Sequence, residues 1–315
     1  MSENGKAIQV QDLHKDFGEV YAVRGIDFDV HTGEIFSLLG PNGAGKTTSI
    51  SMIACLLAPT QGDVLVMGHS VRRDQMAVKA AIGVVPQEIA LYEDLSAREN
   101  LDFWGKMYGL RGQDLHRRVD EVLDVIGLTD RQKGRVDKFS GGMKRRLNIG
   151  VALLNEPQVI IMDEPTVGID PQSRRNILDN VKHLNRQGAT VLYTTHYMEE
   201  AQELSDHIAI MDHGEIIAYG THDELVQIVG ELDRITLDIN AESARVMDRW
   251  QAAEGVHQVV AEDGTLNLLV DDSNVVLPRL FESANDAGVR ITAVEIQEPN
   301  LEAVFLHLTG RALRD

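Results

Sequence analysis

The sequence at residues 40–47 reads Gly40-Pro41-Asn42-Gly43-Ala44-Gly45-Lys46-Thr47. It fits the pattern G-x-x-x-x-G-K-[ST] and lies between an expected strand at 34–39 and an expected helix at 45–57. The glycines leave backbone N–H groups free to point at a phosphate, and the helix N-terminus adds its positive dipole end. In such a loop Lys46 bridges two phosphates, and the Thr47 hydroxyl can hold Mg²⁺. The segment therefore predicts a nucleoside triphosphate site rather than a merely flexible glycine loop.

A second group of candidate residues lies where two further strands end. Residues 159–163 form an apolar strand that ends in Asp163 and is followed by Glu164. Such a pair alone is usually a solvated strand end, but open α/β sheets bind their ligands at this edge. Beside a phosphate loop, Asp163 suits the Mg²⁺ shell and Glu164 suits polarising the attacking water. His196 ends the next strand at the same edge and is a candidate for contact with a γ-phosphate.

A third motif, Phe139-Ser140-Gly141-Gly142-Met143, opens another expected helix. Because Ser140 can cap the helix and two glycines leave N–H groups free, the motif is either an ordinary helix cap or a second anion site. Two γ-phosphate sites in one chain pose a problem, since one ATP has one γ-phosphate. Either the fold brings the two motifs together, or the second serves the nucleotide of another subunit.

The first 230 residues alternate short β-branched runs with amphipathic stretches of helical length, which is typical of an α/β fold on a mostly parallel sheet. A helix-rich segment from residue 97 to 128 indicates an inserted helical subdomain, which extends with the next helix to about residue 150. Strands are expected at 34–39, 82–85, 159–163, 189–194 and 207–212, and helices at 45–57, 141–154, 173–187 and 197–205.

Residues 231–315 follow a different order of elements, and we expect them to form a separate small α+β domain. Their β-α-β-β-α-β order is the ferredoxin-like arrangement. They contain no catalytic constellation, so we interpret them as an accessory domain that packs or dimerises, with ligand sensing as the alternative. Strands are expected at 235–239, 256–262, 265–270 and 290–297, and helices at 243–253, 275–287 and 301–309.

The composition limits the class of protein. A chain of 315 residues favours two domains, here 1–230 and 231–315. The formal net charge of −19 repels phosphate backbones and anionic lipid, so we expect no nucleic-acid partner. No apolar run approaches the ~18 residues of a membrane span, and the N-terminus has no secretory pattern, which predicts a cytoplasmic protein. Cys55, the single cysteine, is expected within an apolar helix as a buried, unreactive thiol.

Five motifs in a fixed order resemble those of one protein family. They are G-P-N-G-A-G-K-T-T, Gln87 after an apolar strand, F-S-G-G-M-K-R-R-L, V-I-I-M-D-E-P and T-T-H. Over residues 7 to about 230 the chain is similar to the nucleotide-binding subunit of an ATP-binding-cassette (ABC) transporter, a P-loop NTPase. The resemblance implies a head-to-tail dimer in which each ATP lies between Lys46 of one subunit and Ser140 and Gly142 of the other. This arrangement resolves the problem of two sites.

The same resemblance implies a role for each matching position. Phe17 would stack on adenine, and Gln87 would touch Mg²⁺ and relay to a membrane partner. Glu164 would be the general base, His196 would sense the γ-phosphate, and Asp170 would communicate between the two sites. The implied nucleotide-binding residues are Phe17, Gly40, Asn42, Gly43, Gly45, Lys46, Thr47, Thr48, Ser140, Gly141, Gly142 and Asp170. The implied Mg²⁺ ligands are Thr47, Gln87 and Asp163, and the implied catalytic residues are Glu164, His196 and Gln87.

Two departures from the common pattern narrow the resemblance. Met143 stands where the signature usually has Gln, and the loop after Glu164 reads P-T-V-G-I-D where many members carry serine and alanine. Both resemble the variant found in drug- and lipid-export members. The tail at 301–311 resembles the C-terminal extension of daunorubicin-resistance-type exporters, whose membrane subunits are separate chains.

The resemblance implies an ATPase that energises export through a separately encoded transmembrane permease. It would act as a dimer with a second copy and be held at the cytoplasmic face of the membrane by that permease. The alternatives are a soluble cassette protein acting on ribosomes or DNA, and a regulator that binds ATP without hydrolysing it. The acidic balance and single cassette disfavour the first, and the presence of Glu164 and His196 disfavours the second.

One group of bulky side chains has two interpretations. It lies beside the Gln87 segment at near-helical spacing, so it either packs the core of the helical subdomain or lines a groove for a cytoplasmic helix of the permease. Its members are Leu91, Tyr92, Phe103, Trp104, Met107 and Tyr108.

Overall fold

The computed structural model describes residues 5–310 except 231, 241–243, 263–264 and 298–299. It divides between His222 and Asp223 into two compact units. Among the described residues, no helix is both long enough and apolar enough to cross a bilayer.

A six-stranded sheet in the order β10-β9-β3-β8-β7-β6 organises the first unit. The strands from β9 to β6 run parallel, and β10 joins the edge antiparallel to β9. This confirms the predicted α/β class and a mostly parallel sheet. The strands are β3 (Ile35–Leu39), β6 (Ile82–Val85), β7 (Val159–Asp163), β8 (Thr190–Thr195), β9 (His207–Asp212) and β10 (Glu215–Gly220).

Side chains of the central strands alternate between two cores, one on each face of the sheet. Ile160 and Met162 of β7 pack into a core shared with the helical part of the unit. Val159 and Ile161 point the other way, into a core shared with the first helix and the N-terminal strands. Strands buried on both faces read as continuous apolar runs, which is why the sequence showed them clearly.

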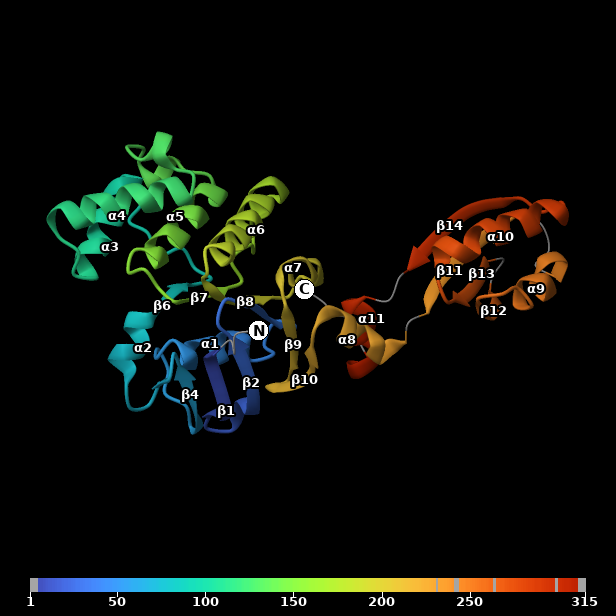
Figure 1. Ribbon diagram of the computed structural model, residues 1–315, viewed down its shortest axis with the longest axis horizontal. Coiled ribbons are helices and arrows are strands. Elements are labelled where there is room, and N and C mark those ends of the chain that lie inside the picture. The colour runs from blue at the N-terminus through green and yellow to red at the C-terminus, as the bar shows by residue number, and fades with distance from the viewer. Residues whose placement is uncertain (1–4, 231, 241–243, 263–264, 298–299, 311–315) are drawn as a thin grey trace. The chain divides into compact units, whose positions relative to one another are not determined.

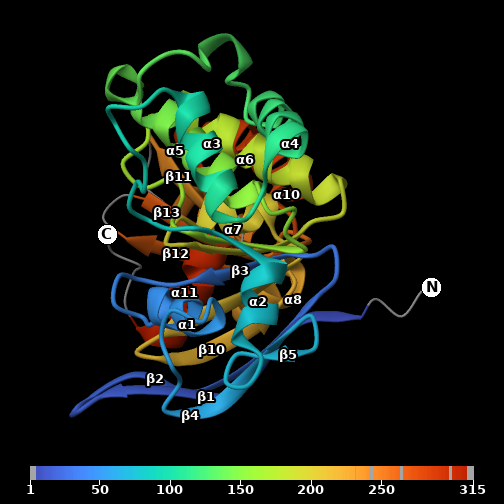
Figure 2. The same cartoon turned by 90° about the vertical axis from the view of Figure 1, so that its left-hand side faces the viewer.

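The helical layer covers one face of this sheet (Figures 1 and 2). A capping box starts α3, because the Ser96 hydroxyl accepts from the Glu99 N–H and the Glu99 carboxylate accepts from the Ser96 N–H. The layer contains α3 (Ala97–Met107), α4 (Gly112–Val125), the 3₁₀ turns η1 (Thr129–Arg131) and η2 (Val136–Lys138), α5 (Gly141–Leu153) and α6 (Pro171–Arg186). The shorter helices α2 (Gln75–Ala81) and α7 (Met198–Leu204) also belong to this unit.

On the opposite face α1 (Lys46–Ile53) lies with a second, antiparallel sheet in the order β2-β1-β4-β5 (Figure 1). The strands are β1 (Lys6–Phe17), β2 (Val20–His31), β4 (Gln61–Val66) and β5 (His69–Ser70). The sequence did not predict this sheet. Register shifts interrupt the pairing of β1 with β2 at several points, so neither strand keeps the strict alternation by which such strands are recognised.

The expectation that Cys55 lies within a helix is wrong. Helix α1 ends at Ile53, and Cys55 follows in a left-handed turn with φ 55°. The Leu56 N–H donates back to the Ser51 carbonyl, as in a Schellman motif, and this bond closes the helix before the predicted end at residue 57. The thiol is half-buried, and burial raises its pKa.

The second unit contains a four-stranded antiparallel sheet in the order β12-β13-β11-β14. Numbered along the chain this is 2-3-1-4, and the predicted β-α-β-β-α-β order is confirmed. The elements are β11 (Asp233–Ile239), α9 (Ala244–Gln251), β12 (Val256–Glu262), β13 (Thr265–Val270), α10 (Ser273–Asp286), β14 (Ile291–Gln297) and α11 (Leu301–Thr309), preceded by α8 (His222–Val226) and η3 (Gln227–Val229). Residue 243, where a helix was expected to begin, and residue 311, at the end of the tail motif, lie outside the described residues.

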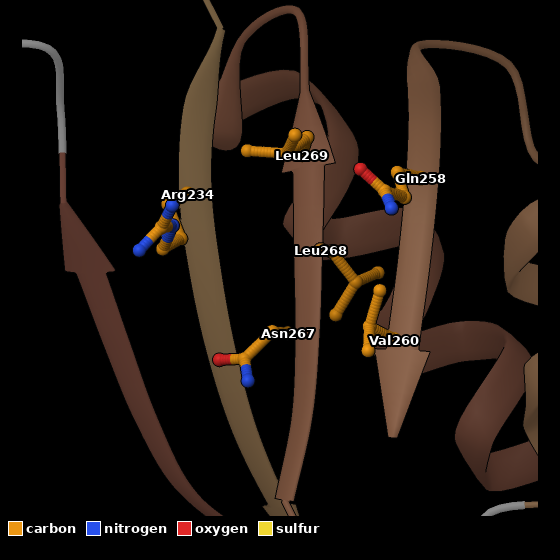
Figure 3. Close-up of a pocket in the computed structure, with 6 residues that line it drawn as sticks. All are labelled: Arg234, Gln258, Val260, Asn267, Leu268 and Leu269. Carbon is orange, nitrogen blue, oxygen red and sulfur yellow. The ribbon is translucent and has the colours of Figure 1, made fainter. Parts of the chain in front are cut away.

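The two faces of this small sheet differ. One packs Ile235, Leu237 and Leu268 against Trp250 of α9 and Leu280 of α10. The other presents polar side chains from three strands around a shallow depression of about 220 Å³ (Figure 3). Arg234, Gln258 and Asn267 line this depression from β11, β12 and β13.

Candidate active site

The predicted phosphate loop connects β3 to α1, and its backbone requires glycine at two positions. Gly45 has φ 107°, and a Cβ there would lie 2.6 Å from the Ala22 carbonyl oxygen. A Cβ on Gly40 would lie 2.1 Å from the Met211 carbonyl oxygen. Asn42 and Gly43 are exposed at the tip of the loop, and Thr48 is half-buried in the first turn of α1. The loop is therefore held tightly at both ends and open at its tip.

Lys46 is buried at the base of this loop. Its Nζ donates to the carbonyl oxygens of Gly40 at 2.7 Å and Pro41 at 3.0 Å. It also forms an ion pair with Glu164, with 3.0 Å between Nζ and Oε1 and about 5% or less of either side chain exposed. Charged groups so deeply buried are compatible with folding only when they are paired, so Lys46 and Glu164 compensate each other.

Asp163 ends β7 beside the first turn of α1. Its Oδ1 accepts hydrogen bonds from the Thr194 hydroxyl at 2.8 Å and the Thr47 hydroxyl at 3.2 Å. Burial raises the pKa of Asp163, while these two hydroxyls oppose the shift. Thr194 is aligned with Asp163 across the parallel pair β7–β8. The residue types predicted as metal ligands, Thr47 and Asp163, are thus within hydrogen-bond distance of each other.

Glu164 follows with φ 42°, a left-handed conformation that is uncommon outside glycine. Its N–H lies 3.0 Å from the Thr194 hydroxyl. The side chain, turned inward, meets two more predicted residues: Gln87 Nε2 donates to Oε2 at 3.3 Å, and His196 Nδ1 lies 3.4 Å from the same oxygen. Lys46, Gln87 and His196 come from three separate segments and converge on the Glu164 carboxylate.

The signature motif takes no part in this cluster. The Ser140 hydroxyl accepts from the Met143 N–H at 3.3 Å and so caps α5. Ser140 and Gly141 are exposed, whereas Gly142 packs so closely on α6 that a Cβ would lie 2.1 Å from the Ser173 hydroxyl oxygen. Among the described residues, no contact joins this motif to the Lys46 cluster. Within one chain the fold therefore leaves the two anion-binding motifs apart.

Two other predicted residues lie outside the Glu164 cluster. Phe17 ends β1 with 53% of its surface exposed, and Lys15 Nζ lies 5.0 Å from the centre of its ring. Asp170 caps α6 by accepting from the Ser173 N–H at 3.0 Å. Hydrogen bonds with the side chain and then the backbone of Ser173 lower the pKa of its carboxyl group. Phe17 offers an exposed aromatic ring, and Asp170 a structural carboxylate at the end of the loop that begins at Glu164.

Sequence reasoning missed several residues that support the site. Thr194 could have been found from its place one residue before the end of β8. Arg145 gave no such signal: its buried guanidinium donates to the carbonyl oxygens of Pro86 at 2.8 Å and Gln87 at 2.6 Å. Only the tertiary structure shows that α5, the helix opened by Ser140, holds the segment that carries Gln87.

A glycine-rich loop between a strand and a helix, a buried lysine and two carboxylates at the sheet edge define a P-loop nucleoside triphosphatase. Comparison with known proteins refines this class. Residues 23–167 match the family model "ABC transporter", and residues 230–309 match "ATP-binding protein DrrA1-3-like, C-terminal domain".

Individual relatives agree with these family models. The chain is 46% identical to the linearmycin resistance ATP-binding protein LnrL of Bacillus subtilis, with 98% of this chain and 100% of that protein covered. It is 38% identical to the Nod factor export ATP-binding protein I of Paraburkholderia xenovorans, with 98% and 99% covered. A dimeric post-hydrolysis structure of the ATP-binding cassette MJ0796 with ADP and phosphate matches at a TM-score of 0.62 and 28% identity, over 68% of this chain and 98% of that one.

The chain belongs to the ABC transporter family, as an ATP-binding subunit that hydrolyses ATP. The names of the relatives favour the predicted exporter over a cassette protein acting on ribosomes or DNA. The resemblance inferred from the five motifs and from the C-terminal tail is confirmed.

Proposed function

We propose that this chain energises export through a separate membrane subunit, working as a dimer whose two ATP sites each use Lys46 of one copy and Ser140 and Gly142 of the other. The convergence of Lys46, Gln87 and His196 on the Glu164 carboxylate is the observation that carries the proposal. The separation of the signature motif from this cluster supports the dimer, as does the dimeric cassette structure that the chain resembles. The relatives' names, a resistance protein and an export protein, support a small secreted molecule as cargo.

The donor set fits Mg²⁺. The Thr47 hydroxyl and Asp163 carboxylate, 3.2 Å apart, and the side-chain oxygen of Gln87 are the hard oxygen ligands that Mg²⁺ prefers. Such a site needs few protein ligands, because nucleotide phosphates and water supply the others. A bound Mg²⁺ would neutralise phosphate charge and also offset the cost of burying the Asp163 carboxylate.

In this proposal Glu164 acts as the general base. Its Oε1 pairs with Lys46, and its Oε2 accepts from Gln87 and lies 3.4 Å from His196 Nδ1, so the carboxylate has a fixed orientation. When Lys46 turns its ammonium toward the phosphates, Oε1 becomes free to accept a proton from the attacking water. In this proposal, the ion pair between Lys46 and Glu164 keeps the base occupied until the lysine has a phosphate to bind.

Replacement of the base tests this assignment. Glu164→Gln should keep ATP binding, lower kcat by roughly 10²- to 10⁴-fold and accumulate an ATP-bound dimer in size-exclusion chromatography. Glu156→Gln is a matched control, because Glu156 also has a left-handed backbone, with φ 52°, but is exposed away from the loop. Turnover at the wild-type rate in Glu164→Gln would show that another group is the base.

Part of the bulky group beside Gln87 packs in the helical layer, and part of it is exposed. Leu91 and Trp104 pack against the core of the helical layer. Tyr92, Phe103, Met107 and Tyr108 are at least 36% exposed, and the rings of Tyr92 and Phe103 meet edge to face at 4.8 Å. We propose that these four side chains receive a cytoplasmic helix of the permease, which would hold the chain at the membrane.

A charge introduced on this surface should weaken binding to the permease without changing ATP hydrolysis. Met107→Asp should leave the ATPase activity of the purified chain unchanged and reduce the fraction of the protein recovered with membranes that contain its permease. Met76→Asp is the control, since Met76 is an exposed methionine on α2, a different helix. If Met107→Asp retains full membrane recovery, this surface is not the docking site.

A further inference from the structure

Glu200 on α7 is a buried carboxylate to which neither the sequence nor the proposed mechanism assigns a role. Only 2% of the residue is exposed. Its Oε1 accepts from the Thr166 hydroxyl at 2.7 Å, and its Oε2 accepts from the hydroxyls of Thr195 at 2.9 Å and Tyr193 at 3.0 Å. Arg174 Nε lies 3.5 Å from Oε1. One carboxylate thus collects three hydroxyl donors and one guanidinium.

These partners belong to three segments that carry proposed site residues. Thr166 lies in the loop between Glu164 and Asp170. Thr195 directly precedes His196, and its hydroxyl also accepts from the N–H of Tyr197 on the other side of that histidine. The third segment is α6, which Asp170 caps and which contributes Arg174. Glu200 is therefore bonded to the loop that follows Glu164 and to the strand that presents His196.

The chemistry of the cluster favours a single arrangement. An ionised carboxylate only accepts hydrogen bonds, so all three hydroxyls must donate to it. Burial, followed by the nearby negative charge of Glu200, raises the pKa of Tyr193 well above its usual value and keeps its hydroxyl a donor. Arg174 is also fixed from a second side, because its guanidinium carbon lies 4.2 Å from the centre of the Tyr197 ring. Charge-assisted bonds of this kind are stronger and more directional than neutral ones.

We propose that Glu200 is a positioning residue for ATP hydrolysis, which holds the Glu164–Asp170 loop and His196 in fixed relation to each other. Glu200 contacts neither Glu164 nor His196 and acts only through the segments that carry them. The proposal therefore rests on the proposed roles of these two residues. Its effect is on the geometry of the base and of the γ-phosphate sensor. Its loss should therefore lower the rate of the chemical step and leave nucleotide affinity almost unchanged.

The first test compares two adjacent glutamates. Glu200→Gln keeps the shape of the side chain and removes its charge, whereas Glu199→Gln makes the same change at an exposed position of the same helix. We expect Glu200→Gln to lower kcat roughly tenfold with the KM for ATP within about twofold of wild type, and Glu199→Gln to match wild type. A wild-type kcat in Glu200→Gln would overturn the proposal, as would a loss confined to ATP affinity.

The second test addresses the path through Thr166 and does not depend on how well Glu200→Gln folds. Thr166→Val removes the hydroxyl at almost constant volume, and Thr166→Ser retains it. We expect kcat to fall roughly three- to tenfold in Thr166→Val and to recover in Thr166→Ser. The double variant Thr166→Val/Glu200→Gln should have a kcat only slightly below that of Glu200→Gln, because both substitutions disrupt the same hydrogen-bond network. Fully additive losses, or equal activity in the valine and serine variants, would contradict the proposal.

A third measurement separates this proposal from the one on which it rests. If Glu164→Gln is inactive but Glu200→Gln is fully active, the positioning role of Glu200 is wrong and the base assignment stands. If Glu164→Gln turns over normally, the base assignment fails first. A tenfold loss in Glu200→Gln would then have to act through His196, and equal kcat values in His196→Ala and His196→Ala/Glu200→Gln would confirm that route.

Discussion

Glu164 combines two properties that are costly for a folded protein. Its backbone is left-handed without being glycine, which costs about 1–3 kcal/mol, and its charge is buried. The surrounding structure offsets this cost with an ion pair to Lys46 and bonds to both Thr194 and Gln87. Such local strain is typical of functional positions, where geometry takes priority over stability. The neighbouring Asp163 is also a buried carboxylate: burial raises its pKa, and the hydrogen bonds from Thr194 and Thr47 partly offset this cost.

The raised pKa of Asp163 predicts how stability depends on pH. Because its folded pKa lies above the ordinary 3.8, the folded state holds the proton more tightly, and the group removes stability as pH rises from 3.8 through the folded value. Asp163→Asn keeps an acceptor for Thr47 and Thr194 but carries no charge. We expect it to raise the melting temperature of the nucleotide-free protein at pH 7 and to abolish Mg²⁺-dependent ATPase activity. A gain in melting temperature that does not shrink at lower pH would contradict burial as the cause.

Site residues that belong to a short sequence motif could be predicted from the sequence. Site residues that are defined only by tertiary contacts could not. The loop at residues 40–47, Asp163 and His196 follow from short patterns next to apolar strands. Thr166 and Glu200 have ordinary surroundings in the sequence, and their partnership requires α7 to fold back on the loop after β7. The contact between Thr166 and Glu200 forms only in the tertiary structure, so no local sequence pattern predicts it.

At the scale of elements, α5 links two parts of the site. Ser140 caps the helix, and one turn later Arg145 donates to the carbonyl oxygens of Pro86 and Gln87. Asn148, a further turn along, accepts from the Ala90 N–H at 3.3 Å. A movement of α5 must therefore move the Gln87 segment. In the proposed dimer, Ser140 contacts one ATP and Gln87 binds the Mg²⁺ of the other ATP. Helix α5 would therefore couple the two ATP sites.

Substitution of Arg145 should reveal this coupling. Arg145→Gln leaves two partly buried carbonyl groups without their charged donor, so we expect a loss of about 2 kcal/mol in the free energy of unfolding and a lower kcat. Arg146→Gln is a close control, because Arg146 donates in the same way to the carbonyls of Ile126 and Gly127, away from Gln87. Urea unfolding and ATPase assays on both variants separate stability from coupling. Equal kcat values in the two variants would remove the special role of Arg145.

The elements differ in how well the sequence predicted them. Strands buried on both faces, such as β7, were predicted to within a few residues, as were the helices α5, α6 and α7. The sheet β2-β1-β4-β5 was missed, because bulges break its alternation and much of β1 and β2 is exposed. Helix α1 was predicted too long, since the turn at Cys55 has no glycine to mark it.

At the scale of the whole molecule, the chain consists of a cassette unit and a smaller C-terminal unit. The side chains that converge on Glu164, those of Lys46, Gln87 and His196, all come from the cassette unit. The covered face of the C-terminal sheet has its own core around Trp250, so this unit does not depend on cassette side chains for that core. We propose that the cassette carries the chemistry and that the C-terminal unit has a role in assembly.

Removal of residues 231–315 tests this division. The truncated protein should bind a fluorescent ATP analogue with an affinity close to that of the full chain. It should form a weaker dimer, or a weaker complex with the permease, in analytical ultracentrifugation. Loss of nucleotide binding on truncation would place the domain boundary elsewhere.

The separation of Ser140 from Lys46 within one chain has a genetic consequence. In the proposed dimer, a copy defective only at Lys46 still offers an intact signature, and a copy defective only at Ser140 still offers an intact loop. Two alleles that are each inactive alone would together assemble one complete site, so a cell carrying both would regain part of the exported flux. The fold of a single subunit thus makes this gene open to complementation between its own mutants.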